Sequence, residues 1–442
     1  METTHPIWRT PAVCDAVTAG DFGTLIRMGR TARNLTLVQA GALCGYSAST
    51  LSRIETGRQP LTDVTLLRHF AEAFGIPPQF FGLAPAPDES SPTGAATAPP
   101  RASVATVRGS AARKDGDDPV RRRRVLTGLV GVTGATLLGT TDQAAVQPVS
   151  AQALRSSLAA ARSLFQHCHY SDLATALPDL ITAAQASRDV ATGHQHEALS
   201  ALLADAYSLA SNLCTRLYDD ALAWVTADRA RSAAQASGNV ASLAEAARVA
   251  SIAMRRHGHH DTAISLLTST ALSLGADTGS PHPDLLGTYG SLLCTASYTA
   301  AQHGHRSHAL ELIGEADDAA RRVGRPTTIH AVFSTTNVAI YQIGVRNALG
   351  DAGAALDYAR RIEIRCLPSP ERQARFCLDT ARAWHRFGDS RKCYQALQAA
   401  EHLAPEELRR PSVRSLVAIL LHAPGPAPSG LRGFAARIGV PV

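Results

Sequence analysis

Apolar residues recur with helical spacing along the first part of the chain, and glycine and small polar residues interrupt them at short intervals. Between Asp21 and Leu83 this pattern predicts five short helices. The first covers residues 21–34, where apolar positions lie three and four residues apart. Because the basic residues of this helix lie between those positions, we expect three arginines to face outward: Arg27, Arg30 and Arg33.

Capping residues mark the ends of the other predicted helices. Thr36 is a favourable N-cap for the second helix, and Ser47, which follows a glycine turn, is one for the third. Gly57 can take the left-handed conformation that ends the third helix. Thr62 would then begin the fourth helix, and a short turn with two phenylalanines completes the set.

Two short helices joined by a glycine-containing turn form a helix-turn-helix, whose second helix can enter the major groove of DNA. Three groups of residues carry this pattern: Leu35-Thr36, Gly45-Tyr46-Ser47 and the run "STLSRIETG" from Ser49 to Gly57. On these residues, the segment from Asp21 to Leu83 resembles the Xre/Cro-type, lambda-repressor-like DNA-binding family. The resemblance implies a small five-helix domain that binds double-stranded DNA.

The resemblance also implies a DNA-contacting surface built around the third helix. Carried over position by position, the implied DNA-binding residues are Thr36, Ser47, Ala48, Ser49, Thr50, Ser52, Arg53 and Arg58. Arg53 is the best candidate for reading guanine, because a guanidinium can donate to O6 and N7 together; the alternative is an arginine that is merely solvated. The family pattern pairs Arg30 with Glu55 to brace the first helix against the third. Leu37 replaces the glutamine that often binds phosphate in this family, so that contact is not expected.

Residues 84–120 are rich in proline, alanine, serine and glycine, a composition that cannot bury enough apolar surface to fold. We expect a flexible linker there. The next segment, 121–151, begins with the run Arg121–Arg124 and continues with an apolar, glycine-containing stretch. It resembles a twin-arginine export signal, but such signals lie at the N-terminus. The expected interpretation is a helix packed on the next domain, with additional phosphate contacts or membrane attachment as the alternatives, so no membrane partner is expected.

From Gln152 to Val442 alanine and leucine dominate, and long amphipathic segments alternate with short polar turns. After each turn one small or apolar position recurs: Leu173, Ala221, Ala263, Ala309, Ala355 and Cys393. The steps between these positions are 48, 42, 46, 46 and 38 residues. Such helix pairs stack into a solenoid. They resemble tetratricopeptide repeats with longer helices or loops than usual, and six or seven pairs are expected.

Three segments are expected to line the concave inner side of this solenoid: residues 198–217, 285–302 and 333–349. Solenoids use such surfaces to bind extended ligands. Six polar and aromatic side chains lie on these segments: Tyr207, Asn212, Tyr289, Tyr298, Asn337 and Tyr341. Tyrosine offers contact area and a hydrogen bond, and asparagine can bond to a peptide backbone, so the set is a candidate effector site. The alternative is that each side chain packs between neighbouring repeats.

Composition narrows the functional classes only slightly. The formal net charge of +6 permits nucleic-acid contact without requiring it. The eight cysteines are scattered, as in the reduced core of a cytosolic protein, and no signal peptide opens the chain, so a cytoplasmic, nucleoid-associated location is expected. Histidines gather at the repeat turns, yet no repeat has the paired spacing of a zinc site, so neither a metal nor another cofactor is expected. Without a nucleophile elbow, P-loop or dinucleotide fingerprint, we expect no enzyme activity.

These patterns predict an all-α protein: a five-helix lambda-repressor-like domain over residues 21–83, a flexible linker, and an α-solenoid over residues 152–442. The architecture resembles bacterial helix-turn-helix regulators with tetratricopeptide repeats. It implies a homodimeric transcriptional regulator whose repeats sense a peptide, a protein or a small molecule. The alternative is an interaction scaffold with a non-specific or vestigial DNA-binding domain. Salt-dependent, sequence-selective DNA binding would separate the two.

Overall fold

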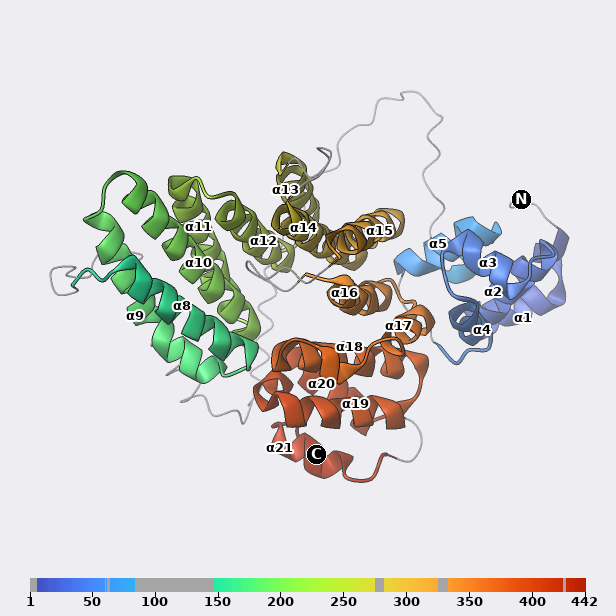
Figure 1. Ribbon diagram of the computed structural model, residues 1–442. Coiled ribbons are helices and arrows are strands. Elements are labelled where there is room, and N and C mark those ends of the chain that lie inside the picture. The colour runs from blue at the N-terminus through green and yellow to red at the C-terminus, as the bar shows by residue number, and fades with distance from the viewer. Residues whose placement is uncertain are drawn as a thin grey trace, which may run out of the picture. The chain divides into compact units, whose positions relative to one another are not determined.

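The computed structural model describes residues 6–59, 61, 64–83, 147–274, 282–324, 333–423 and 427–442. The chain divides into two compact units, Met1–Pro119 and Val120–Val442. The described residues form helices and no strands (Figure 1), which confirms the all-α prediction. None of the described helices is both long enough and apolar enough to cross a membrane. The predicted linker 84–120 and the segment 121–146, which holds the arginine run, lie outside the described residues.

The N-terminal unit contains the five predicted helices and two further elements before them. In chain order they are η1 (Pro6–Arg9), α1 (Pro11–Ala19), α2 (Phe22–Ala32), α3 (Leu37–Cys44), α4 (Ala48–Glu55), α5 (Val64–Phe74) and η2 (Pro78–Phe81). The five from α2 to η2 confirm the prediction for residues 21–83; Thr62, the predicted start of α5, lies outside the described residues. The sequence pattern does not predict η1 and α1, because "PIWRTPAVCDAVTA" holds two prolines and few periodic apolar residues.

An apolar core holds the N-terminal unit together, with Leu25 of α2 and Phe70 of α5 fully buried. Trp8 of η1 and Val13 of α1 belong to the same core. Burying a large apolar side chain contributes about 1.5–3 kcal/mol. The folded unit therefore includes η1 and α1 in addition to the predicted segment 21–83.

The ends of the helices follow the capping signals in the sequence. Thr36 caps α3 in a capping box: its hydroxyl accepts from the Gln39 backbone N–H, and the Gln39 side chain accepts from the Thr36 N–H. Ser47 caps α4 by accepting from the Thr50 N–H. Gly57, just after α4, has the left-handed φ of 67° predicted for it. These local hydrogen bonds satisfy backbone donors that the first turn of a helix leaves free.

The second unit is a stack of helix pairs, in which each helix with an even label packs on the next one (Figure 1). Its helices are α8 (Ala151–Gln166), α9 (Tyr170–Asp189), α10 (Gly193–Leu217), α11 (Asp220–Ser237), α12 (Val240–Arg256), α13 (His260–Ser273), α14 (Pro283–Gln302), α15 (Arg306–Val323), α16 (Thr335–Ala348), α17 (Ala352–Ala359), α18 (Pro370–Phe387), α19 (Ser390–Leu403), α20 (Pro411–Leu421) and α21 (Leu431–Arg437), with short turns η5 (Ile364–Cys366) and η6 (Pro405–Arg409). The pairs from α8/α9 to α20/α21 confirm the predicted helical repeat.

The recurring position of the repeats lies four residues after the N-cap of each second helix. It is fully buried at Leu173, Ala263, Ala309, Ala355 and Cys393. In the second repeat the predicted Ala221 is exposed, and Ala223 takes the buried position instead. The N-cap there is Asp219, so Ala221 is only two residues after the cap and Ala223 is the fourth. The Ser211 hydroxyl of α10 donates to the Ala223 carbonyl oxygen at 2.9 Å, so the two helices approach closely at this point.

The stack curves until its first helices meet its last ones. The hydroxyl of Tyr170, at the start of α9, donates to the carboxylate of Glu407 in η6 at 2.5 Å. Arg216, near the end of α10, forms an ion pair with Glu371 of α18. Ala374 of α18 is buried in the same apolar cluster as residues of α8 to α12. These partners lie far apart in the sequence, so local patterns do not predict the closure.

All eight cysteines are free, and six of them are buried. Burial raises the pKa of the Cys168 thiol to about 12, so it stays protonated and unreactive at neutral pH. Cys14 and Cys366 are exposed, and the prediction of core thiols is wrong for these two.

Candidate DNA interface and cationic pocket

Helix α3, a short turn and helix α4 form the helix-turn-helix of the N-terminal unit. The turn begins at Gly45, which has a left-handed φ of 70°. The ring of Tyr46 is buried in the turn and stacks on Phe70 of α5, with ring centroids 5.2 Å apart. Gly41 lies so close to the turn that an added Cβ would be 2.4 Å from the Tyr46 carbonyl oxygen. Glycine at this position therefore permits the tight turn that sets α4 against α3.

An ion pair braces α4 against α2. Arg30 donates from Nε and Nη2 to the two carboxylate oxygens of Glu55 at 2.6 and 2.9 Å, and from Nη1 to the Leu35 carbonyl oxygen at 2.8 Å. The Glu55 side chain is 5% exposed and that of Arg30 is 17% exposed, so water screens the pair only weakly. The hydrogen bond to Glu55 raises the pKa of Arg30. The predicted pairing of these two residues is confirmed.

The arginines of α2 depart from the prediction that all three face outward. Arg27 is exposed, as predicted. Arg30 turns to Glu55, and Arg33 donates from Nη1 to the carbonyl oxygen of Ala73 in α5. The prediction is wrong for Arg30 and Arg33, because both guanidiniums reach acceptors on neighbouring helices.

Most of the predicted DNA-binding residues reach the surface of the N-terminal unit. Thr36, Ser49 and Arg58 are exposed, and Ser47, Ala48, Ser52 and Arg53 are partly exposed. Thr50 is fully buried, and its hydroxyl accepts from that of Ser47, so its predicted DNA contact is wrong. The remaining side chains place hydroxyls and two arginines on and beside α4. Such groups can donate to phosphate oxygens and base edges.

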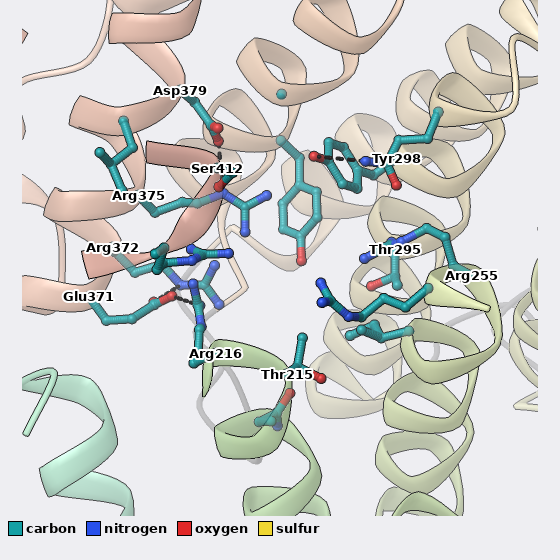
Figure 2. A pocket seen from close by; sticks show the side chains of 18 of the residues that line it. Thr215, Arg216, Arg255, Thr295, Tyr298, Glu371, Arg372, Arg375, Asp379 and Ser412 are labelled. Atoms are coloured by element: carbon teal, nitrogen blue, oxygen red, sulfur yellow. Dashed lines mark hydrogen bonds and ion pairs between the residues drawn. The ribbon is translucent and has the colours of Figure 1, made fainter. Parts of the chain in front are cut away.

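A pocket of about 980 Å³ lies inside the repeat unit. The first helix of each pair, from α8 to α20, contributes to its wall, as predicted for α10, α14 and α16. Three of the predicted effector residues line it: Asn212, Tyr298 and Tyr341. Figure 2 shows that charged side chains from several helices surround the same space.

The other three predicted effector residues are absent from the pocket wall: Tyr207, Tyr289 and Asn337. Tyr207 is buried, and its hydroxyl accepts from Nε2 of Gln185 in α9 at 2.8 Å. The Tyr289 hydroxyl donates to Glu315 of α15 at 3.3 Å. Asn337 is buried in the first turn of α16. These three side chains are buried among the helices, as in the alternative interpretation.

Arginine dominates the pocket wall. Ten arginines line it: Arg162, Arg216, Arg248, Arg255, Arg256, Arg372, Arg375, Arg382, Arg386 and Arg410. Five carboxylates line it with them: Asp205, Asp220, Glu245, Glu371 and Asp379. Burial, and to a lesser extent Arg386, lowers the pKa of the lining His385, which is therefore neutral near pH 7. Ten positive and five negative side chains leave an excess of five positive charges in the wall.

Two buried carboxylates of α18 hold the arginines of the wall in place. Asp379 accepts from Arg375 at 2.8 Å and from Arg382 at 2.7 Å. Glu371 forms an ion pair with Arg216. Burial alone would raise the pKa of both carboxyl groups, but the neighbouring arginines outweigh it and lower both pKa values. Both groups are therefore ionised, and their charges fix the guanidiniums.

A third buried carboxylate, Glu407, lies behind the wall and is 1% exposed. It accepts from the Tyr170 hydroxyl at 2.5 Å and from Arg410 Nη1 at 2.8 Å, and Arg216 Nη1 lies 3.4 Å away. Burial would raise the pKa of Glu407, but Arg216 and Arg410 outweigh burial and hold this pKa at about 2. Glu407 thus ties the first helices of the stack to the last ones.

The sequence patterns described above do not predict these pocket arginines, although α12 and α18 carry a detectable signal. Arg248 and Arg255 are seven residues apart, as are Arg375 and Arg382. Seven residues correspond to two helical turns, so the members of each pair lie on one face of their helix. Charged residues on a solvent-exposed helix face have the same spacing, so the spacing alone does not identify a pocket. Only the curvature of the stack turns these faces into the wall of a pocket.

Three exposed side chains from two neighbouring turns come together outside the pocket wall: Asp261, His303 and His305. Their nitrogen and oxygen atoms that could bind a metal lie within 4.8 Å of one another. His303 also stacks on His260, with ring centroids 4.6 Å apart. The expectation of no metal considers only the spacing of histidines within single repeats. It does not detect this cluster, because the cluster combines side chains from two repeats.

Comparison with curated proteins and with solved structures finds no match to this chain. The model of a protein family described as a helix-turn-helix domain matches residues 21–79. This segment contains α2 to α5, and with them the Arg30–Glu55 brace and the exposed side chains of α4. The N-terminal unit thus contains a helix-turn-helix domain, which suggests that the chain binds DNA.

Proposed function

We propose that the chain is a sequence-specific transcriptional regulator of the Xre/Cro type. The observation that supports this most directly is the helix-turn-helix: α4 presents hydroxyls and Arg53 at the surface, while Glu55 on its other side is anchored to Arg30. A helix held in this way can enter the major groove, where phosphate contacts position it and base contacts specify the sequence. The proposed location is the cytoplasm, at the nucleoid, and no enzyme activity is proposed.

The tetratricopeptide-like repeats are proposed as the sensor of a peptide, protein or small-molecule partner. A ligand changes DNA binding only if it binds two conformations of the protein with different affinity. The pocket supports such coupling because Arg216 and Glu371, which close the stack, also line it. A ligand that contacts these side chains can alter the closing contacts and hence the curvature of the stack.

Arg53→Ala is expected to weaken specific DNA binding by about 1–3 kcal/mol and to relax the preference at one base pair. The reason is the loss of a guanidinium that can donate to guanine O6 and N7 together. Fluorescence anisotropy of the full chain, with single-base variants of a site selected from random DNA, measures both effects. The control is Arg155→Ala, which removes an exposed arginine of α8 and should change neither.

Equal affinity and equal base preference after Arg53→Ala would show that Arg53 is a solvated charge. Weak, unselective binding by the unmodified chain would instead support the scaffold alternative and overturn the proposed regulator. The same titrations at increasing salt concentration separate phosphate contacts from base contacts. The number of phosphate contacts sets how steeply the DNA affinity falls with salt concentration.

The chain is also expected to be a homodimer, on and off DNA. One helix-turn-helix presents one short recognition helix, and related dimers bind half-sites about 34–36 Å apart. Sedimentation velocity of the full chain, alone and with the selected DNA site, measures the state directly. A monomer under both conditions would contradict this expectation.

A further inference from the structure

We propose that the pocket of the repeat unit binds a phosphorylated small molecule that carries at least two negative charges. The proposal deepens the sensing role proposed above, and its test measures ligand binding without DNA. Figure 2 shows guanidiniums from opposite sides directed into one space, with Arg216, Arg372 and Arg375 on one side and Arg255 on the other. They come from α10, α18 and α12, so only the curved stack brings them together.

Arg255 has no carboxylate partner among the described residues. Its Nη1 donates to the Thr299 hydroxyl at 3.2 Å, and its guanidinium lies 5.1 Å from the ring centroid of Tyr298. The guanidinium of Arg375 lies 5.6 Å from the same ring, so two like charges share one aromatic neighbour. Burial lowers the pKa of Arg255, and the charge of Arg375 lowers it further. An anion between the two guanidiniums would offset this repulsion.

The pocket does not balance its own charge. Ten arginines and five carboxylates line it, and Glu407 behind the wall reduces the excess to four positive charges. Like charges repel more strongly in a partly desolvated cavity than in water. A monocarboxylate would offset one charge, whereas a phosphate monoester carries about 1.5 to 2 negative charges at pH 7. The excess therefore favours a ligand with one or more phosphates.

The arginines are positioned before a ligand arrives. Asp379 is 3% exposed and accepts from Nε of Arg375, so the terminal Nη groups of that arginine are available to a ligand. Glu371 is 5% exposed and holds Arg216. A guanidinium fork matches the spacing of two phosphate oxygens, and fixing it in advance reduces the entropy lost on binding.

The size and the aromatic lining of the pocket favour a small molecule. Its volume of about 980 Å³ lies within the range of about 300–1,000 Å³ that small-molecule sites occupy. Tyr298 and Tyr341 line the same wall and can pack against a planar group or donate a hydrogen bond. A nucleoside phosphate combines a planar base with the required charge.

Isothermal titration calorimetry of the full chain with inorganic pyrophosphate tests the phosphate chemistry, and ATP tests whether a nucleoside adds affinity. At constant ionic strength, pyrophosphate is expected to bind with a Kd below about 1 mM. Citrate, which carries only carboxylates, should bind at least tenfold more weakly.

Arg255→Gln should weaken pyrophosphate binding at least tenfold and leave the melting temperature unchanged, since no carboxylate loses its partner. The control is Arg360→Gln in the exposed Arg360–Asp357 pair, which should leave binding unchanged.

Failure of both pyrophosphate and ATP to bind the unmodified chain would overturn the proposal. So would a folded Arg255→Gln variant that binds pyrophosphate as well as the unmodified chain does. Tighter binding of citrate would assign the pocket to carboxylates, and displacement of pyrophosphate by a short DNA duplex would assign it to nucleic acid; either result contradicts the proposal. Arg53→Ala should leave pyrophosphate binding intact, so failure of the pocket proposal is distinguishable from failure of the DNA-binding proposal.

Discussion

Glu55→Gln is expected to destabilise the N-terminal unit by about 3 kcal/mol, the lower end of the range for breaking a buried ion pair. The substitution keeps the shape of the side chain but removes the charge that Arg30 meets at 2.6 and 2.9 Å. Arg30 is then left largely shielded from water without a counter-charge. Amide hydrogen exchange in α4, measured by mass spectrometry on the full chain, should accelerate roughly a hundredfold. Specific DNA binding should weaken with it, because α4 carries the proposed interface.

Two comparisons establish that the brace causes this loss. Glu72→Gln, which changes an exposed glutamate of α5, should alter stability by no more than about 0.5 kcal/mol. Combining Arg30→Met with Glu55→Met should cost less than the sum of the single changes, since two apolar side chains can replace a buried ion pair. If the stability loss of the double variant equals the sum of the two single losses, Arg30 and Glu55 act independently. The ion pair would then not brace α4 against α2.

Glu407→Gln is expected to destabilise the repeat unit by about 3–5 kcal/mol at pH 7. Its carboxylate accepts from Tyr170 and Arg410 and lies beside Arg216, so glutamine would leave two partly buried arginines short of a counter-charge. The loss opens the contact between the first and the last helices of the stack. Thermal unfolding followed by circular dichroism should show a melting temperature that is lower by several degrees.

This destabilisation has a defined pH dependence. The pKa of Glu407 is about 2 in the folded chain, against an ordinary value of 4.5. A depressed folded pKa contributes stability that is fully present above the ordinary value and is lost as the pH falls toward the folded pKa. The melting temperatures of the unmodified chain and of Glu407→Gln should therefore converge between pH 4.5 and pH 2. An equal difference at pH 7 and pH 3 would contradict the assigned charge state.

The control for this second substitution is Glu363→Gln. Glu363 pairs with Arg365 at the surface, and their side chains are 54% and 83% exposed. Exposed pairs contribute about 0–1 kcal/mol, so the melting temperature should hardly change at either pH. A loss as large as that of Glu407→Gln would show that burial does not account for the effect.

The helix-turn-helix was predictable because its signals are local. The capping residues Thr36 and Ser47 bond to backbone groups within three residues, and Gly57 adopts its left-handed conformation by itself. The buried state of Thr50 was not predictable from the family pattern. That residue lies on the face of α4 that turns toward the core, and a resemblance of sequence assigns contacts without showing which way each side chain points.

Local sequence patterns are enough to predict the helical class, the helix ends, the helix-turn-helix and the repeated pairing of helices, because each depends on residues within one or two turns of helix. In the second repeat the recurring buried position lies two residues later than predicted, at Ala223 instead of Ala221, because the helix begins after the Asp219 cap. The positions of the long charged side chains depend instead on contacts between helices. Arginine reaches an acceptor on whichever helix the fold brings near, so Arg33 and Arg216 acquire partners that no local pattern encodes. The cationic pocket exists because the stack curves and closes on itself, which is a property of contacts between residues far apart in the chain.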